Sequence, residues 1–307
     1  MPTPVIIDCD PGHDDAMALL LALASPELEL VAVTTVAGNA SLPKVTENAI
    51  KVLDVAGAGH VPVAAGADRA LLHPARSADE VHGESGLDGP ELPPPSRQPE
   101  PVHAVELIAS KLRERPLTLI PTAPLTNIAL LLALHPELHE RIERIVLMGG
   151  AVGLGNVTPS AEFNIWCDPE AAYRVFTSGI DVTLVGLDVT HRAMLSAARA
   201  EQLRDKGRAA AVVADLHAFY RRFHEQVYGH DDTPVHDALA VAHVIDPTLL
   251  RTEDLYVEID VTQGPARGRT VVDQLKRLGR PANAHVALDV NATGFIDLLT
   301  ERIGSLP

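Results

Sequence analysis

Cysteine, tryptophan and basic residues are scarce in this sequence of 307 residues, and it contains no long apolar run. The two cysteines, Cys9 and Cys167, are too few for a disulfide framework and lie outside any zinc-binding spacing. The longest apolar run, residues 16–24, is far shorter than the about 20 residues that cross a bilayer. An acidic residue stands at position 8 with no basic region before it, which is not the pattern of a secretory signal. We therefore expect a soluble, cytoplasmic protein.

Negative charge is in large excess. The chain has 25 Lys and Arg residues against 41 Asp and Glu residues, a formal net charge of −16. Such a surface repels phosphate backbones and anionic lipids, which argues against nucleic acids and membranes as partners. Small neutral substrates and metal cations remain possible ligands.

Short β-branched runs alternate with longer helical segments along the chain. Most of these runs are continuously apolar, as strands are when helices cover both faces of a sheet. The alternation predicts an α/β fold with a mostly parallel, open, doubly wound central sheet flanked by helices on both faces. No linker divides the chain, so we expect residues 1–307 to form a single domain. The expected strands are 4–7, 30–36, 117–120, 144–149, 181–186 and 256–261, the expected helices are 14–24, 43–56, 101–113, 125–134, 168–178 and 209–226, and residues 286–303 complete the domain as a strand and a helix.

Four carboxylates surround the end of the first expected strand. Asp8 and Asp10 follow it, a Pro-Gly turn comes next, and Asp14 and Asp15 open the following helix. Carboxylates this close repel one another unless a positive group lies among them. No Lys or Arg occurs before residue 44, so a divalent cation is the natural partner. Oxygen donors alone favour Ca²⁺ or Mg²⁺ over zinc.

Two other interpretations of this cluster are possible from the sequence. Helix capping by Asp14 with the other carboxylates exposed explains one or two of the four acids, not all of them. Aspartyl-phosphate chemistry, as in a Mg²⁺-dependent phosphohydrolase, uses a DxD motif after the first strand together with a lysine from a later loop. None of the five lysines of the chain lies in a convincing loop directly after an expected strand, which disfavours this alternative.

Polar side chains follow several other expected strands, at the edge where sites form in parallel sheets. Asn39 follows the second strand, Thr126 opens a helix after the third, and Asn156 lies in a glycine-rich loop after the fourth. Glu162 and Asn164 come two residues apart in an EFN segment before the single tryptophan. Each residue alone has an ordinary explanation, such as an N-cap for Thr126.

Two histidines stand near further polar groups. His82 lies among glycines in a proline-rich stretch, residues 73–101, that lacks periodicity. His236 precedes Asp237 at the start of an apolar helix, where Asp237 is either a dipole-stabilised carboxylate or a distant ligand of the cation. A histidine titrates near neutral pH and suits proton donation.

The motifs together resemble the inosine–uridine-preferring nucleoside hydrolase family. DCDPGHDDAMA is very close to the N-terminal signature of that family, and five later segments match in the family's order at similar spacing over residues 4 to 303. The later segments are HGESGLDG, PLTNIA, LMGG, AEFNIWCDPEAA and VHDALAV. The resemblance implies an α/β fold, a tightly held Ca²⁺ and hydrolysis of the N-glycosidic bond of ribonucleosides.

The resemblance also implies a role for each matching residue. The calcium ligands would be three carboxylates and one main-chain carbonyl, and the remaining matches would contact the sugar or the base. The implied metal ligands are Asp10, Asp15, Asp237 and the carbonyl of Thr126; the implied ribose contacts are Asp14, Asn39, Met148, Asn156, Glu162 and Asn164; the implied base contacts are His82, His236 and, by a loose alignment, Tyr228. His13 occupies a variable position of the signature and receives no role.

The implied reaction uses a cation-activated water that attacks C1′ of the ribose, with Asp10 as the base. Positive charge develops on the sugar, and the surrounding carboxylates stabilise it. The departing base receives a proton or a hydrogen bond from His236 or, as a second candidate, His82. Residues 73–101 and 224–236 are expected to close over the base and exclude water.

Other members of the family that the sequence resembles stack the base between two tryptophans, an arrangement that the single tryptophan of this chain excludes within one chain. The resemblance therefore disfavours the strictly purine-specific subclass and implies an inosine–uridine or pyrimidine preference. The family resemblance further implies a homotetramer or homodimer. A non-catalytic nucleoside- or ribose-binding protein on the same scaffold is the alternative from another functional class.

Overall fold

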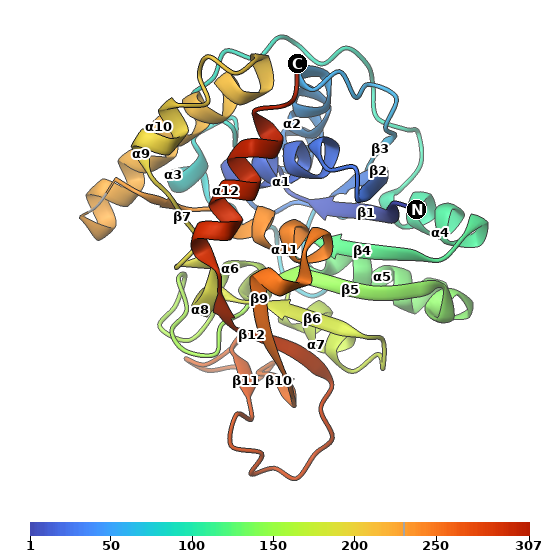
Figure 1. Ribbon diagram of the computed structural model, residues 1–307. Coiled ribbons are helices and arrows are strands. Elements are labelled where there is room, and N and C mark those ends of the chain that lie inside the picture. The colour runs from blue at the N-terminus through green and yellow to red at the C-terminus, as the bar shows by residue number, and fades with distance from the viewer. Residues whose placement is uncertain (230) are drawn as a thin grey trace.

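The computed structural model describes residues 1–229 and 231–307, without the side chain of Tyr228. Within these residues, one eight-stranded sheet forms the centre of the molecule in the order β3-β2-β1-β4-β5-β6-β12-β9 (Figure 1). Its strands are β1 (Thr3–Cys9), β2 (Leu28–Thr35), β3 (Val63–Ala65), β4 (Leu117–Pro121), β5 (Ile142–Met148), β6 (Val182–Val185), β9 (Leu250–Leu255) and β12 (Ala284–Val290).

Parallel pairing runs from β3 to β12. Strand β1 lies between β2 and β4, with Val5 opposite Leu30 and Thr118. Only β9, at the edge of the described sheet, is antiparallel to its neighbour β12. The predicted mostly parallel sheet is therefore confirmed.

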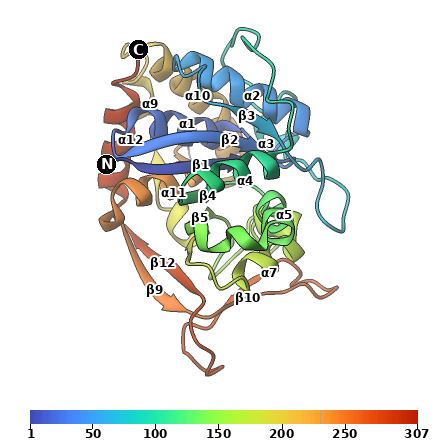
Figure 2. The same ribbon diagram turned by 90° about the vertical axis from the view of Figure 1, so that its right-hand side faces the viewer.

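Helices cover both faces of this sheet. Successive residues of β1 point to opposite faces, and those on each face are buried in a different apolar cluster. Val5 and Ile7 belong to one buried apolar cluster, while Ile6 belongs to the other. The first cluster contains residues of α1 (His13–Ala24), α2 (Leu42–Val55), α10 (Arg208–Tyr228), α11 (His236–Ile245) and α12 (Ala292–Ile303). The second contains residues of α4 (Ala104–Glu114), α5 (Thr126–Leu134) and α7 (Pro169–Phe176), and Figure 2 shows these three helices away from α1 and α12.

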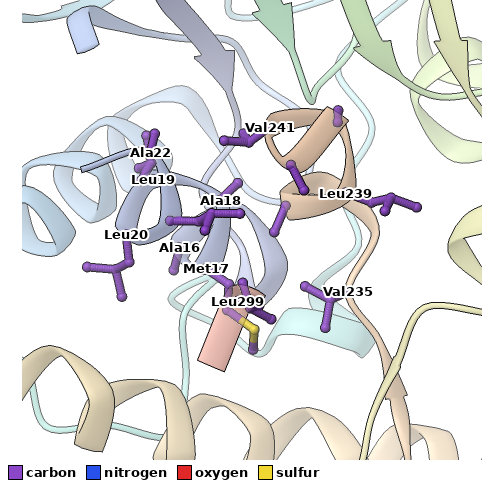
Figure 3. Close-up of a cluster of buried hydrophobic side chains, with 14 of the residues drawn as sticks. Ala16, Met17, Ala18, Leu19, Leu20, Ala22, Val235, Leu239, Val241 and Leu299 are labelled. Carbon is purple, nitrogen blue, oxygen red and sulfur yellow. The ribbon is translucent and has the colours of Figure 1, made fainter. Parts of the chain in front are cut away.

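Helix α1 is buried on all sides, which fixes where its first turn lies. Its apolar residues from Ala16 to Ala22 are at most 2% exposed. They pack against side chains such as Leu239 of α11 and Leu299 of α12 (Figure 3). A helix that is apolar all round needs partners on every side, and α1 finds them in the sheet, α2, α11 and α12.

Shorter elements connect these layers. They are the helices α3 (Asp79–His82), α6 (Phe163–Cys167), α8 (Leu187–Thr190) and α9 (Ala197–Glu201), the 3₁₀ helices Pro136–Arg141 and Pro247–Leu249, and the paired short strands β7 (Met194–Leu195) with β8 (Thr233–Pro234) and β10 (Val257–Ile259) with β11 (Thr270–Val272). No helix among the described residues has the length and apolarity needed to traverse a bilayer.

The prediction that residues 256–261 form a strand of the main sheet is wrong. The central residues of this segment form β10, which pairs antiparallel with β11 outside the main sheet. The side chain of Asn283 accepts the main-chain N–H of Val257 at 2.7 Å and donates to its carbonyl at 2.9 Å. These bonds use the groups through which Val257 would continue the ladder of β9. The strand β9 itself was missed, because its half-exposed, charged sequence LRTEDL is not continuously apolar.

The two segments expected as loops also contain helix. Residues 79–82 of the stretch 73–101 form α3, and residues 224–228 continue α10 to its end. His230, in the second segment, lies outside the described residues.

We predict that Phe295→Ala lowers the free energy of unfolding by about 3–5 kcal/mol, because it leaves a cavity in the core. The Phe295 side chain is 0% exposed in the cluster that holds α1, α11 and α12 together. Urea denaturation measures the change, and Leu154→Ala, at a side chain that is 79% exposed, is the control with a change within about 0.5 kcal/mol. Equal losses in the two variants would contradict this account of the core.

Candidate active site

The site begins where β1 ends. Asp8 lies in β1, Asp10 follows it, and Asp14 and Asp15 lie in the first turn of α1. The main-chain N–H of Gly12 donates to the Asp15 carboxylate at 3.1 Å, which closes the start of the helix. Unpaired N–H groups and the helix dipole make this turn favourable for negative charge.

Asp237 joins this cluster from α11. One carboxylate oxygen from each of Asp14, Asp15 and Asp237 lies within 4.8 Å of the other two, and all three side chains are buried. The apolar packing of α1 against α11 brings these residues together from positions more than 200 apart in the sequence (Figure 3). Spacing left the role of Asp237 open and the family resemblance implied a place among the cation ligands; the structure places its carboxylate beside those of Asp14 and Asp15.

Asp10 is held beside this cluster by Asn39. The main-chain N–H of Asn39 donates to Asp10 Oδ2 at 2.6 Å. The Asn39 side-chain amide donates to Asp10 Oδ1 at 3.3 Å and to Asp15 Oδ2 at 3.1 Å. One amide group therefore bridges two carboxylates and fixes their separation.

Burial and mutual repulsion disfavour the ionised form of these acids. Burial, followed by the charge of Asp15, raises the pKa of Asp10 well above its usual range. The same two causes raise the pKa of Asp14 to about 7. Burial and the charges of the other three acids raise the pKa of Asp237. The described residues lining the adjacent cavity include no Lys or Arg, so no side-chain cation offsets this repulsion. A hard divalent cation fits this all-oxygen donor set.

Thr126 is not part of the cluster. Its hydroxyl donates to Asp168 at 2.7 Å, and it lines a separate surface pocket with residues such as Ala67 and Leu130. As the first residue of α5, it directs its carbonyl along the helix axis. The threonine that contacts the carboxylates is Thr122, whose hydroxyl donates to Asp15 Oδ1 at 2.8 Å.

Thr122 was missed although a signal for it exists. It directly follows β4, whose last residue Pro121 pairs with Asp8 of β1. A residue one position beyond a strand end lies at the edge where the neighbouring strand delivers Asp10. Placing β4 to within one residue would have been enough to choose Thr122 over Thr126.

A cavity of about 320 Å³ opens above the carboxylates, and most of the predicted ligand-binding residues line it. Its polar wall comes from the loop after β5 and from α6. Glu162 accepts main-chain N–H groups from Gly150 at 2.8 Å and Asn164 at 2.9 Å. The predicted residues among its lining are Asp14, Asn39, His82, Met148, Asn156, Glu162, Asn164, His236 and Asp237.

The amide of Asn164 is held in one orientation. Its Nδ2 donates to the Thr122 carbonyl at 2.9 Å and to the Met148 carbonyl at 3.2 Å. Both amide hydrogens are thus engaged, which leaves Oδ1 as an acceptor. Asn156 is exposed at the rim, where its Oδ1 accepts the main-chain N–H of Phe163 at 3.0 Å. Burial raises the pKa of Glu162 to about 7.

Histidines and aromatic rings form another wall of the cavity. His236 Nδ1 lies 2.7 Å from the Thr190 hydroxyl, and the ring of His191 meets it edge-on at 5.4 Å. Burial lowers the pKa of both His82 and His236 well below the usual value, so these rings are neutral. Tyr228 ends α10, and its side chain lies outside the described residues, so its predicted base contact stays a prediction.

Several residues of this wall were not predicted from the sequence. Tyr220, Phe223 and His224 of α10 line the cavity, and their helical spacing is a recognisable signal. His13 is 0% exposed and lies with its Nδ1 3.0 Å from Nδ1 of His82. Burial lowers the pKa of His13 to about 4.

Comparisons with known proteins agree with this geometry. The family described as inosine-uridine preferring nucleoside hydrolase matches residues 5–297. A pyrimidine-specific ribonucleoside hydrolase RihA from Shewanella sp. (strain ANA-3) is 50% identical over 99% of this chain and 96% of its own length. The protein of the same name from Salmonella paratyphi C (strain RKS4594) is 50% identical over 99% of both chains.

Solved structures are similar over the same extent. A purine-preferring ribonucleoside hydrolase from Gardnerella vaginalis is 35% identical with a TM-score of 0.94, covering 99% of both chains. An inosine-uridine preferring nucleoside hydrolase from Bacillus anthracis is 26% identical with a TM-score of 0.83, covering 98% of this chain and 99% of that one.

The raised carboxyl pKa values predict how stability depends on pH without a cation. An acid whose pKa is higher in the folded state contributes stability that is lost as the pH rises through that value. Asp14 and Glu162, with pKa values of about 7, therefore destabilise the protein above neutral pH. His13 has the opposite sign, because its lowered pKa contributes stability that is complete above the unfolded value of 6.5. Above pH 6.5 the carboxyl effect stands alone.

We predict that the Tm of the chelator-treated protein falls between pH 6.5 and about 8. Added Ca²⁺ should raise the Tm most at the upper end of this window, since it favours the ionised carboxylates. Thermal unfolding followed by circular dichroism measures both effects. A Tm that rises with pH in chelator would contradict the assignment of raised pKa values.

Proposed function

Because the chain belongs to the inosine-uridine preferring nucleoside hydrolase family and is an enzyme that hydrolyses ribonucleosides, we propose that it cleaves pyrimidine ribonucleosides at a Ca²⁺ site. The observation that carries the proposal is the buried group of Asp14, Asp15 and Asp237 beside the cavity. The pyrimidine preference is supported by relatives of 50% identity named as pyrimidine-specific, and by the single tryptophan.

The proposed cation ligands are Asp10, Asp15, Asp237 and a main-chain carbonyl. We assign the carbonyl to Thr122 in place of Thr126, since Thr122 contacts Asp15 and lines the cavity. Asp14 lies close enough to join this shell or to accept a hydrogen bond from a ribose hydroxyl. A bound cation of this kind supplies Lewis-acid chemistry toward water and sugar hydroxyls.

The polar wall suits a ribose. Asn164 offers Oδ1 as an acceptor because both its amide hydrogens are bound to main-chain carbonyls. Glu162 is held by main-chain N–H groups and is buried, so it accepts a hydroxyl hydrogen bond in a water-poor setting. Asn156 closes the rim, and Met148 provides an apolar surface beneath the sugar.

Asp10 is proposed as the base that takes the proton of the attacking water. Its carboxylate is fixed by two hydrogen bonds from Asn39, so its position is defined before substrate arrives. As the bond from C1′ to the base lengthens, positive charge develops on the ribose. The nearby carboxylates stabilise this charge because they are oriented in advance and shielded from water.

His236 is proposed as the group that donates to the departing base. When Nδ1 accepts the hydrogen of the Thr190 hydroxyl at 2.7 Å, the neutral ring carries its own proton on Nε2. The ring lines the same cavity as the residues proposed to hold the ribose. Loops 73–101 and 224–236 are proposed to cover the base, and a homotetramer or homodimer remains our expectation for the assembly.

The alternatives lose support at this point. Membership of a hydrolase family argues against the hypothesis of a non-catalytic binding protein. An aspartyl-phosphate mechanism calls for a lysine, and the described residues that line the cavity provide none.

We predict that the purified protein releases ribose from uridine and cytidine with a higher kcat/KM than from inosine and adenosine. The histidines that line the cavity of about 320 Å³ offer hydrogen bonds to a small base. The chain has a single tryptophan, so a purine cannot stack between two of them within one chain. A reducing-sugar assay across the four nucleosides measures the ranking. A higher kcat/KM for adenosine would refute the pyrimidine preference, and no turnover of any of them would refute the hydrolase.

We predict that Asp10→Asn lowers kcat by about 10²–10⁴-fold, the usual contribution of a positioned base. The amide keeps the shape of the side chain, so circular dichroism should remain unchanged. Thr126→Val is the matched control: it removes one hydrogen bond to Asp168, costs about 1 kcal/mol of stability and leaves kcat and bound calcium at the parent level. A kcat as low in Thr126→Val as in Asp10→Asn would contradict the assignment of Asp10 as the base.

A further inference from the structure

His13 makes a hydrogen bond that fixes its own tautomer. Its Nε2 lies 2.8 Å from the main-chain carbonyl of Asp88. A carbonyl oxygen only accepts hydrogen bonds, so Nε2 of His13 carries a proton. In a neutral imidazole the other nitrogen, Nδ1, is then an acceptor.

That acceptor faces His82. The two Nδ1 atoms of His13 and His82 lie 3.0 Å apart, which is a hydrogen-bond distance. Two unprotonated nitrogens would repel each other at this distance, so one of them holds a proton. With Nδ1 of His13 unprotonated, the proton belongs to Nδ1 of His82.

The surroundings favour neutral rings. His13 is 0% exposed and His82 is 5% exposed. The ring of His13 stacks on Phe219 at 5.2 Å and on Tyr220 at 5.3 Å between centroids. A charged imidazolium is costly in such a setting. In the competing arrangement both ring nitrogens of His13 carry a proton, so His13 is a cation and Nδ1 of His82 is the acceptor. The main-chain N of His13, 3.4 Å from Nδ1 of His82, would then donate to it as well. This arrangement gains one long hydrogen bond at the expense of burying a charge.

The orientation of His82 leaves its other nitrogen toward the cavity. The Nδ1–Cε1 edge lies against Gly12, where a Cβ atom would come within 2.6 Å of Nδ1. His82 also lines the cavity, and its Nε2 has no hydrogen-bond partner among the described residues. Gly12 is therefore required for the close approach, and Nε2 is available to a ligand.

We propose that His13 is a positioning residue that holds His82 in the Nδ1–H tautomer, so that His82 presents Nε2 to the cavity as a hydrogen-bond acceptor. The tautomer is independent of the substrate, but its consequence for binding rests on the proposed nucleoside. An acceptor at this place binds a base through an N–H group, such as the ring N–H of uracil or the amino group of cytosine. It also means that His82 holds no proton on Nε2 to give to the departing base, which leaves that step to His236.

The decisive measurement is ¹⁵N NMR of the histidine-labelled protein at fixed pH. Comparison with His13→Gln and His82→Gln assigns the signals. We expect His82 to show a protonated Nδ1 and an unprotonated Nε2, and His13 to show the reverse. A protonated Nε2 on His82, or both nitrogens protonated on His13, would overturn the proposal. This result is independent of catalysis, so it stands apart from a failure of the proposed function.

Kinetics of two variants test the consequence. His13→Leu removes the acceptor, and we expect kcat/KM for uridine to fall about tenfold, mainly through a higher KM, with the His82 signals shifting toward a mixture of tautomers. His13→Gln offers an amide oxygen to His82 and an amide hydrogen to Asp88, and should restore most of the loss.

His217→Leu is the control for removing a buried histidine. His217 lies on α10 with its Nε2 2.9 Å from the Leu195 carbonyl, outside the cavity lining, so kcat/KM should not change. An unchanged His82 tautomer in His13→Leu, or a Gln variant as weak as the Leu variant, would refute the positioning role. If His13→Leu does not fold, the NMR of the parent protein still decides the tautomer.

Discussion

The repulsion among buried carboxylates at the end of β1 is the constraint on which the rest of this structure depends. Asp10, Asp14, Asp15 and Asp237 all have raised pKa values, and burial is the largest cause for each. A protein gains nothing in stability from such an arrangement, since the low dielectric strengthens repulsion as well as attraction. The arrangement is useful only if a cation completes it, and the fold supplies the energy that keeps the acids together until then.

That energy comes from the packing of α1. The helix carries two of the acids in its first turn and apolar residues in the rest of its length, so burying the apolar part fixes the acidic end. The same contacts hold α11, which begins with His236 and Asp237 (Figure 3). Stability and site geometry are thus coupled through one buried helix.

Local patterns in the sequence were sufficient for the inner parallel strands of the sheet and for the acids of the first loop. Continuous apolar strands and a Pro-Gly turn between acidic pairs depend on neighbours a few residues away, and these predictions agree with the structure. The resemblance implied the carbonyl of Thr126 and we propose that of Thr122, a distinction that local patterns cannot make because it depends on where β4 ends, to within one residue. The strand at 256–261 failed because the amide of Asn283 takes the main-chain groups of Val257.

His13 was missed for a different reason. Its partners His82 and Asp88 lie 69 and 75 residues away in the sequence, in a stretch that shows no periodicity. No pattern within the signature distinguishes a histidine that points to solvent from one that reaches a distant loop. Contacts between irregular segments leave no periodic trace, so sequence alone could not assign this residue.

The two walls of the cavity depend on different physics, and this separates the reaction from the choice of base. The wall that we propose holds the ribose is acidic and built on strand ends, while the wall that we propose holds the base consists of imidazoles and aromatic rings from α3, α10 and α11 and of His191, which follows α8. Neutral imidazoles recognise a ligand by which nitrogen bears the proton, and that is decided by partners outside the cavity lining, such as Thr190 and His13. A structure with a TM-score of 0.94 belongs to a purine-preferring hydrolase, so the backbone alone does not determine the base. The preference must therefore lie in side chains and in the hydrogen bonds that set their tautomers.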